Sequence, residues 1–413
     1  VDEGTPFEVA DRALDPLGLP MSPFTLLQLV GPAVAFHVSE TMHAAFPDRF
    51  YVSDNLRKVV EAGKSAIWDY STGTPQVDAE VAALFDQGDA PLTEEPGKLW
   101  PLLIPWIARA VTKGTGIIAT ENAYHGNTTT ATEISPSSKS AEPRGANIFL
   151  VPAPDTYRHP DGEAETAFVD SVGKALSDMK KAGIRPAAMI ADSILSSDGV
   201  YPGQPGFLAE AANLVRKAGG LYIADEVQPG FGRTGGHMWG FERHGLIPDL
   251  VVMGKPMGNG YPMGAVVVKP EILNVFGAKS GYFNTFGGSP VAAAAGMAVL
   301  DVIADEHLME NARDTGAYFL KRLQNLTKTS EHAGDARGAG LFLGFEVVTA
   351  KKSRKPDQTR AVTIVNALRD NGILTGTAGK HGNILKIRPP LCFKREHADM
   401  VATGLAEALA AVS

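Results

Sequence analysis

The sequence predicts an α/β protein whose main sheet is largely parallel, followed by a smaller α+β unit. Two observations carry this prediction. Between about residues 115 and 300, short apolar runs alternate with amphipathic helical patterns, which is the order of a parallel sheet with helical crossovers. Beyond residue 300, helices alternate with only two strand-like runs. We therefore expect a boundary between a large and a small domain near residue 300.

The expected strands are apolar runs bounded by turn residues or prolines. In the large domain they lie at 116–120, 147–154, 187–193, 221–225, 250–254 and 265–269, with helices at about 165–181, 207–220 and 291–303. In the small domain, helices are expected at about 308–325, 359–370 and 396–411, and strands at 342–348 and 384–391. The first 110 residues show no clear periodicity, so we predict no element there.

Composition and charge exclude several classes of protein. Hydrophobic residues make up 44% of the 413 residues, enough to exclude disorder of the bulk of the chain. The net charge of −8 argues against a nucleic-acid partner. The single cysteine, Cys392, cannot form an internal disulfide, and the ten histidines lack metal-ligand spacing, so we expect no metal. Neither a membrane span nor a signal-peptide pattern is present, which predicts a cytoplasmic protein without a membrane partner.

Two strand-like runs lead into residues that could do chemistry. The run 221–225 ends in Asp225, and the run 250–254 is followed by Lys255. Ligands of open α/β sheets bind beyond the carboxyl ends of the strands. A lysine that forms a Schiff base needs a pocket of low dielectric constant, and a nearby carboxylate can keep a pyridinium nitrogen protonated. The alternative is that both are solvated surface charges, the commoner use of such residues.

A glycine-rich segment lies between these two residues. GFGRTG at 230–235 matches the GxGxxG pattern of dinucleotide-binding sites. That fingerprint must directly follow a strand and open a helix, whereas here residues 226–229 intervene and GGHMWG follows. We interpret the segment as a turn that lets the backbone approach a ligand, with dinucleotide binding as the weaker alternative.

Three further segments could contribute to the same site. Tyr124 and His125 follow the first strand, where an aromatic pair can stack on a planar cofactor. Thr285 and Ser289 precede a helix whose N-terminus could bind phosphate. Arg388 follows the last strand and suits a substrate carboxylate. Each has a structural alternative, namely core packing for Tyr124, ordinary helix capping for the hydroxyls, and a surface salt bridge for Arg388.

Four blocks of the sequence resemble the class III pyridoxal-phosphate-dependent aminotransferases, which have fold type I, and in particular their ω-aminotransferase branch. The blocks are AYHGNT (123–128), ADEVQPGFGRTGGHMWGFERHGLIPDLVVMGKPMGNGYPMGAVV (224–267), FNTFGGSP (283–290) and LKIRPPL (385–391). The resemblance implies a large cofactor-binding domain over 61–300, with a mostly parallel mixed sheet flanked by helices. It also implies a small α+β domain over 301–413 and an N-terminal segment, 1–60, that lies partly in the small domain.

The resemblance implies a role for each matching residue around the cofactor, pyridoxal 5′-phosphate. Lys255 would carry the internal aldimine and then move the proton between substrate and cofactor. Asp225 would pair with the pyridine nitrogen, and Val227 and Tyr124 would pack on the two faces of the ring. Gln228 would lie near the ring hydroxyl.

The same resemblance places further residues around the cofactor and the substrate. His125 and Gly126 belong to the first cofactor-binding block. Thr285 would reach the phosphate bound in a neighbouring subunit, which implies a homodimer or a tetramer. Arg388 would accept a substrate carboxylate. Asp192 stands where many members have a glutamate that pairs with that arginine.

One part of the family's pattern is missing. Members carry a phosphate-binding segment of the Ser-Gly-Ser/Ala-Glu-Ala type upstream of Tyr124, whereas residues 97–114 read GKLWPLLIPWIARAVTKG here. The nearest likeness, Ser71-Thr72-Gly73-Thr74, lies much further upstream. The family's N-terminal segment is not recognisable either. We therefore expect the phosphate site and the substrate pocket to depart from the family.

The function that the resemblance implies is transamination. The enzyme would move an amino group from an ω-amine or an amino acid to a keto acid such as pyruvate, in two ping-pong half-reactions. Two alternatives remain open. One is another reaction on the same fold, by a mutase, racemase, decarboxylase or phospho-lyase. The other is a non-catalytic homologue with a structural or binding role.

Overall fold

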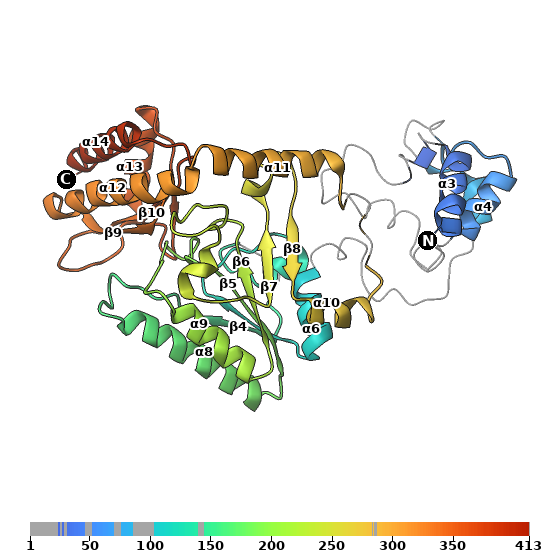
Figure 1. The fold of residues 1–413 in the computed structure, drawn as a ribbon, viewed down its shortest axis with the longest axis horizontal. Coiled ribbons are helices and arrows are strands. Elements are labelled where there is room, and N and C mark those ends of the chain that lie inside the picture. Colours follow the sequence, from blue (N-terminus) through green and yellow to red (C-terminus); the bar gives the residue numbers. More distant parts are fainter. Residues whose placement is uncertain are drawn as a thin grey trace. The chain divides into compact units, whose positions relative to one another are not determined.

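The computed structural model describes residues 24, 27–28, 31–45, 52–69, 76–85, 103–138, 144–282, 284 and 287–412. Thr285 and residues 71–74 lie outside this part of the chain. Residue contacts divide the chain into two units, 1–102 and 103–413, each with its own core (Figure 1). Among the helices that the structure describes, none is long and apolar enough to cross a lipid bilayer.

The first unit consists of short helices and one minimal strand pair. It comprises α3 (Pro32–Ala45), α4 (Asp54–Glu61), α5 (Ala79–Leu84), β1 (Trp68–Asp69) and β2 (Gln76–Val77). Ser53 and Asp78 cap α4 and α5, since their side chains accept hydrogen bonds from backbone N–H groups of the first turn. Val59, Ile67 and Val81 are fully buried at its centre. Apart from α3, these elements are too short to leave a clear periodicity in the sequence.

The second unit contains a six-stranded mixed sheet. In spatial order its strands are β4 (Ile148–Val151), β3 (Gly116–Thr120), β5 (Pro186–Asp192), β6 (Leu221–Asp225), β7 (Leu250–Met253) and β8 (Ala265–Val268). The first five are parallel to one another, and β8 pairs with β7 in the antiparallel direction. Strand β3 is buried along its whole length, as expected for a strand covered on both faces. The predicted α/β class with a mostly parallel sheet is confirmed.

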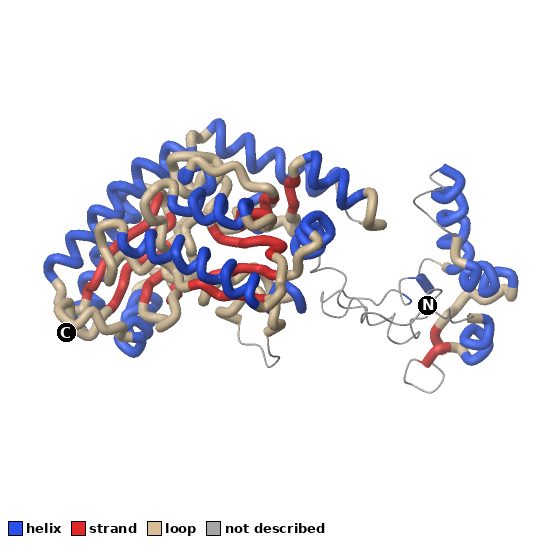
Figure 2. The backbone as a smooth tube through the Cα atoms, turned by 90° about the horizontal axis from the view of Figure 1, so that it is seen from below, coloured by secondary structure: helices blue, strands red, loops and turns tan. Residues whose placement is uncertain are grey.

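Helices cover both faces of this sheet, as Figure 2 shows. On one face, α8 (Glu163–Lys181) and α9 (Phe207–Lys217) pack on a core that includes Ile118 and Met189. On the other face, α6 (Leu103–Thr112) and α10 (Pro270–Gly277) pack on a core that includes Ile117 and Ile190. Neighbouring residues of one strand thus enter opposite cores, which is the two-residue period of a strand.

A second, antiparallel sheet follows in the C-terminal part of this unit. Its order is β11 (Gly376–Ala378), β12 (Ile384–Ile387), β10 (Phe342–Val347) and β9 (Ala333–Ala339). It shares a core with α12 (Leu308–Thr329), α13 (Gln358–Asp370) and α14 (Arg395–Ala411). The predicted α+β unit is present, with two strands, β9 and β11, that periodicity did not indicate. Strand β9, AGDARGA, mixes small and charged residues, and β11 has only three residues.

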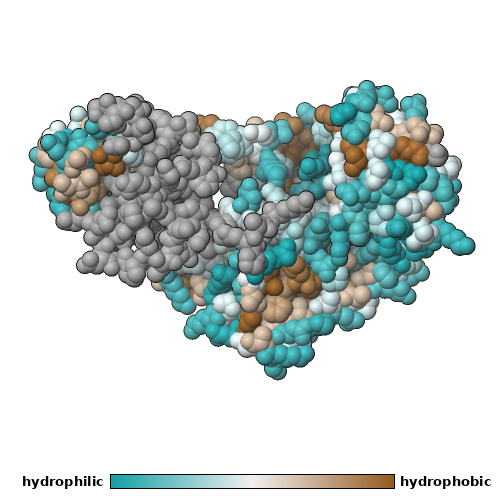
Figure 3. Space-filling model, turned by 180° about the vertical axis from the view of Figure 1, so that it is seen from behind, coloured by the Kyte–Doolittle hydropathy of each residue, from teal (hydrophilic) through white to brown (hydrophobic). Residues whose placement is uncertain are grey.

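Helix α11 (Pro290–Asp305) is apolar, and the described residues leave much of it exposed. None of its residues is buried, and Val291 and Met297 expose 63% and 57% of their surface. Figure 3 shows several separate groups of apolar residues on the face opposite to that of Figure 1. The Ser289 side chain accepts a hydrogen bond from the Ala292 N–H and so caps this helix. An exposed helix of this composition marks an interaction surface.

Candidate active site

The carboxyl ends of three neighbouring strands bring the predicted residues together. Strand β5 ends at Asp192 and β6 at Asp225, and these two residues are partners in the parallel register. Asp225 also aligns with Val252 of β7, and Lys255 follows that strand. Asp192, Asp225 and Lys255 therefore lie at one edge of the sheet, where α/β proteins bind their ligands.

The backbone at Lys255 is strained. Lys255 begins a short 3₁₀ turn, Lys255–Met257, and has a φ of +25°, in a region that non-glycine residues seldom adopt. Such strain persists only where the surrounding structure enforces it, and it clusters at functional sites. The lysine side chain is reachable from solvent, and its Nζ atom lies 5.9 Å from the centroid of the Tyr124 ring.

Asp225 is buried and held from two sides. It is 6% exposed. Its Oδ2 atom lies 2.7 Å from Nδ1 of His125, and its Oδ1 atom accepts a hydrogen bond of 3.0 Å from the Val227 N–H. The His125 side chain is itself 3% exposed. His125 Nε2 is buried and has no partner within the described residues. Each carboxylate oxygen keeps a free lone pair, so Asp225 can accept a further hydrogen bond at either oxygen.

The two residues expected on the ring faces lie beside Lys255. Tyr124 is 39% exposed, so its ring is not part of the core, contrary to the structural alternative. Val227 is adjacent to Gly254, since a Cβ atom on that glycine would meet a Val227 methyl group at 3.7 Å. Gly126 has a φ of +131°, which only glycine adopts readily. This conformation turns the chain after His125 and leaves that side chain facing Asp225.

A chain of hydrogen bonds leads from Asp192 to Arg388. The Asp192 carboxylate accepts the hydroxyl of Ser196, and the Ser196 oxygen accepts a hydrogen bond of 2.6 Å from Nε2 of Gln228. Oε1 of Gln228 in turn accepts a hydrogen bond of 3.0 Å from Arg388. Asp192 thus reaches the arginine through two neutral side chains rather than directly. Burial, and next the carboxylate of Asp225, raise the pKa of Asp192.

A cavity of about 420 Å³ lies at this site. Its lining includes Tyr124, Gln228, Lys255, Lys386 and Arg388. Lys386 was not predicted, although its position two residues before Arg388 on a strand places both side chains on one face. Burial, and next the charge of Arg388, lower the pKa of Lys386 to about 8.

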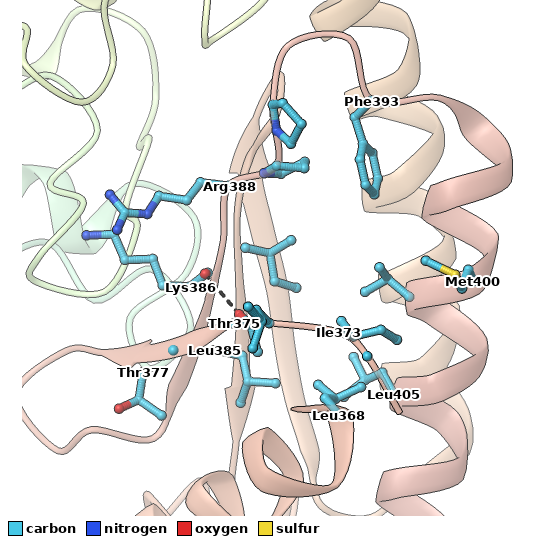
Figure 4. Close-up of a pocket in the computed structure, with 17 residues that line it drawn as sticks. Leu368, Ile373, Thr375, Thr377, Leu385, Lys386, Arg388, Phe393, Met400 and Leu405 are labelled. Atoms are coloured by element: carbon cyan, nitrogen blue, oxygen red, sulfur yellow. Dashed lines mark hydrogen bonds between the residues drawn. The ribbon is translucent and has the colours of Figure 1, made fainter. Parts of the chain in front are cut away.

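Strand β12 separates this cavity from an apolar groove. Figure 4 shows Lys386 and Arg388 projecting to one side of the strand, away from Phe393 and Met400. The groove has a volume of about 730 Å³, and its lining includes Leu385 together with backbone or side-chain atoms of Lys386 and Arg388, which line both spaces. The alternation of β12 therefore delivers cations to the sheet edge that carries Lys255 and apolar side chains to the opposite side.

The residues present fit the ring and the carbonyl group of pyridoxal 5′-phosphate. Lys255 supplies an amine, Asp225 supplies a buried carboxylate with a free lone pair, and Tyr124 supplies an aromatic surface beside the amine. In the region 97–114, which lacks the family's phosphate-binding pattern, the described residues include α6, whose Ile107 and Ala108 are buried in the core. Thr285 and residues 71–74, the other phosphate candidates, fall outside the described residues.

The two ends of the chain match models of two different protein families. The family model for class III aminotransferases matches residues 105–409. Residues 1–66 match a different model, the C-terminal domain of 3-hydroxyacyl-CoA dehydrogenase. This second match accounts for the absence of the aminotransferase N-terminal pattern.

A comparison with individual proteins also finds aminotransferases. The chain is 39% identical to an alanine–glyoxylate aminotransferase 2-like protein of Drosophila melanogaster over 318 residues, covering 74% of this chain and 64% of that protein. It therefore spans less than two thirds of this relative.

Solved structures agree with this match. A phospholyase from Arthrobacter in complex with phosphoethanolamine is 40% identical, with a TM-score of 0.73 and coverage of 75% and 74% of the two chains. A Pseudomonas amine transaminase in the pyridoxal-phosphate-bound form is 27% identical, with a TM-score of 0.68 and coverage of 75% and 73%. The fold is therefore fold type I and the family's cofactor is pyridoxal 5′-phosphate. The chain belongs to the class III aminotransferase family.

Proposed function

We propose that the chain acts as an aminotransferase that moves an amino group from an ω-amine or an amino acid to a keto acid such as pyruvate. The observation that supports this most directly is the strand-end arrangement of Lys255 and Asp225. The lysine amine lies next to the Tyr124 ring, and His125 holds the buried carboxylate. A purely structural protein needs none of these residues together.

Each of these residues has a task in the proposed reaction. Pyridoxal 5′-phosphate, when bound, supplies the electron sink for the charge that develops on the substrate carbon. Asp225 would hold a proton at the ring nitrogen, and His125 keeps the Asp225 carboxylate in place. Lys255 would hold the cofactor covalently and, once the substrate amine has displaced it, would take and return the proton at the substrate carbon.

Lys386 and Arg388 support a substrate with an anionic group. Both line the cavity that contains Lys255. Arg388 has no carboxylate partner among the described residues, and its recorded side-chain contact there is the neutral amide of Gln228. A guanidinium group that is not paired with a carboxylate can bind a substrate carboxylate or phosphate with paired hydrogen bonds.

Sodium borohydride reduction tests the assignment of Lys255. Reduction of the protein loaded with pyridoxal 5′-phosphate should fix the cofactor on the peptide that contains Lys255, as peptide mass spectrometry detects. The Lys255→Arg variant should lose this label, whereas Lys217→Arg, at an exposed lysine of α9, should keep it. A label on another lysine, or none on the wild-type protein, contradicts the proposal.

A phospho-lyase is the second candidate. Two observations favour it, the pair of cations in the cavity and the similarity to the Arthrobacter phospholyase. Incubation with phosphoethanolamine distinguishes the two activities. A phospho-lyase releases inorganic phosphate in many turnovers without a keto acid, whereas an aminotransferase converts at most one equivalent of its cofactor to the amine form.

The proposal includes a homodimer, or a tetramer built from dimers. Helix α11 supports it, because none of its residues is buried and a second subunit would bury its apolar side chains. Thr285, contributed to the cofactor phosphate of the neighbouring subunit, belongs to the same proposal. So do the division into domains at residues 60 and 300, the substrate role of Asp192 and a cytoplasmic location.

A further inference from the structure

We infer that Ser196 is a positioning residue that fixes the amide of Gln228 and, through it, the place of Arg388, so that the site favours amines that carry an anionic group. This inference rests on the proposed function and specifies its substrate class. Neither the strand-end pattern nor the family blocks indicated Ser196, because it lies in the loop after β5.

The hydroxyl of Ser196 has two partners in a fully buried position. The residue is 0% exposed. Its Oγ atom donates to the Asp192 carboxylate and accepts from Gln228 Nε2 at 2.6 Å. Its backbone N–H also donates to Asp192, at 3.1 Å. Ser196 is therefore tied to the end of β5 from both its backbone and its side chain.

The partners at the two ends impose one direction on the whole chain. A guanidinium group only donates, and the Asp192 carboxylate accepts the backbone N–H groups of Ile194 and Ser196 as well as the Ser196 hydroxyl. Arg388 must therefore donate to Oε1 of Gln228, and the Ser196 proton must point to Asp192. The serine lone pair then accepts from Nε2, so the Gln228 amide has a single favourable orientation. Hydrogen bonds that run in one direction strengthen each other.

The loop that carries Ser196 is rigid. Leu195 and Val200 have φ values of +47° and +60°, which a leucine and a β-branched valine adopt only under constraint. Backbone hydrogen bonds close the loop, from Leu195 to Asp192 at 3.0 Å and from Tyr201 to Ile194 at 2.8 Å. The fold thus holds Ser196 in place, so its oxygen stays in position to accept the hydrogen bond from Gln228.

The consequence is a held arginine that keeps its full charge. A direct bond to Asp192 would neutralise Arg388, whereas the neutral amide of Gln228 orients the guanidinium group and leaves its charge for the substrate. An arriving carboxylate or phosphate then displaces one hydrogen bond to a neutral group, a modest loss compared with a broken ion pair. Removing the Ser196 hydroxyl frees the Gln228 amide to turn, and Arg388 loses its fixed place.

Binding of propionate to the cofactor-free protein tests the inference without relying on activity. Propionate is a carboxylate without an amine, and calorimetric or NMR titration measures its affinity. We expect Ser196→Ala to weaken binding about five- to tenfold, the effect of one lost hydrogen bond. The control Ser171→Ala removes another serine hydroxyl, which donates to the Phe168 carbonyl within α8, and should leave the affinity unchanged. Equal affinity of Ser196→Ala and wild type overturns the inference, and so does a wild-type protein that does not bind propionate.

A second measurement separates this inference from the proposed function. With the loaded protein, β-alanine and propylamine are compared as amine donors. Ser196→Ala should raise KM for β-alanine and leave kcat, and both constants for propylamine, nearly unchanged. A loss of kcat with both donors would mean a structural role instead. Should the wild-type protein convert neither donor, the proposed function fails, while the propionate titration still decides the role of Ser196. If Ser196→Ala does not fold, propionate titration of Gln228→Met tests the same relay, because this variant loses the amide oxygen that accepts from Arg388; the kinetic comparison is not applied to it, since Gln228 is also assigned to the cofactor ring.

Discussion

His125 is the residue whose role follows most directly from a single distance. Its Nδ1 atom lies 2.7 Å from the Asp225 carboxylate, and both side chains are almost fully buried. The pair keeps the carboxylate oriented at the carboxyl end of β6, next to Lys255. A buried carboxylate without such a partner would lose both its orientation and part of its stabilisation.

Replacing His125 should therefore weaken the site without unfolding the protein. We expect His125→Ala to lower kcat/KM about tenfold to a hundredfold, because a hydrogen bond to a charged group contributes about 1.5–3 kcal/mol. Steady-state kinetics and the absorbance of the bound cofactor measure this effect. His332→Ala, at a half-buried histidine that bonds to the carbonyl of Thr349, is the control. Equal losses in both variants would contradict the role of His125.

Lys386 predicts a pH dependence of substrate binding. Burial and the nearby Arg388 lower its pKa from 10.5 to about 8. The side chain is charged below that pH and neutral above it, so KM for an anionic donor should rise as the pH passes through about 8. Donor titrations at several pH values, with β-alanine and propylamine, measure the effect.

The Lys386→Met variant is the matched control for this dependence. It should have the high KM for β-alanine already at neutral pH and show no further rise near pH 8. Propylamine should respond to neither the pH change near 8 nor the substitution. A wild-type KM for β-alanine that is constant across pH 8 would rule out a binding role for Lys386.

At the scale of elements, Glu226 links the end of β6 to the short 3₁₀ helix Gly240–His244. Its carboxylate is 0% exposed and accepts hydrogen bonds from Gly240 N–H at 2.7 Å, from Phe241 N–H at 2.9 Å and from the Ser193 hydroxyl. This carboxylate folds the glycine-rich segment 230–235 back beside the strand ends. Residues 230–235 form turns, as their sequence indicates, whereas an approach of this backbone to a ligand stays a prediction.

Truncation of Glu226 should destabilise the protein strongly. Glu226→Ala leaves three donors without a partner, two of them buried and the Phe241 N–H partly buried. Each buried donor costs about 1–3 kcal/mol, so we expect a loss of about 3 kcal/mol or more in the free energy of unfolding. Denaturant unfolding measures it. Glu226→Gln keeps one carbonyl acceptor and should lose less, and Glu210→Ala, at an exposed residue of α9, should change little. A stable Glu226→Ala protein would contradict this account.

The sequence predicted elements well where each had a clear physical signature. The buried runs GIIAT and LYIAD correspond to β3 and β6 residue for residue, because strands covered on both faces are continuously apolar. Strand β9 escaped detection, since AGDARGA buries Arg337 in an ion pair with Glu346 instead of an apolar side chain. Such long-range pairing leaves no local pattern.

The candidate site was predictable only in part, for a related reason. Lys255 and Asp225 stand at strand ends, which can be located along the sequence. Ser196 lies in a loop, and its function depends on Gln228 and Arg388, residues far away in the chain. The position of Lys386 on the same face as Arg388 could have been inferred from strand alternation.

For the whole molecule, the exposed apolar surface of α11 predicts self-association. Val291 and Met297 expose more than half of their surface, and burial of such side chains against a second copy stabilises a dimer. Val291→Asp should shift the protein toward monomers, as sedimentation velocity measures. Val362→Asp, at an exposed valine of α13, is the matched control. A monomeric wild type, or a Val291→Asp protein that remains dimeric, would contradict the proposed interface.

The central claim is that one site with Lys255 and Asp225 at its base carries out an amino-group transfer. It is tested most directly by a single half-reaction. The purified protein is loaded with pyridoxal 5′-phosphate, and an amine donor such as alanine or β-alanine is added without a keto acid. The account predicts that the visible absorbance band bleaches while one equivalent of the cofactor's amine form and of the carbonyl product appear, and that pyruvate restores the band. A protein that does not retain the cofactor, or that retains it and leaves the donors unchanged, would contradict the account.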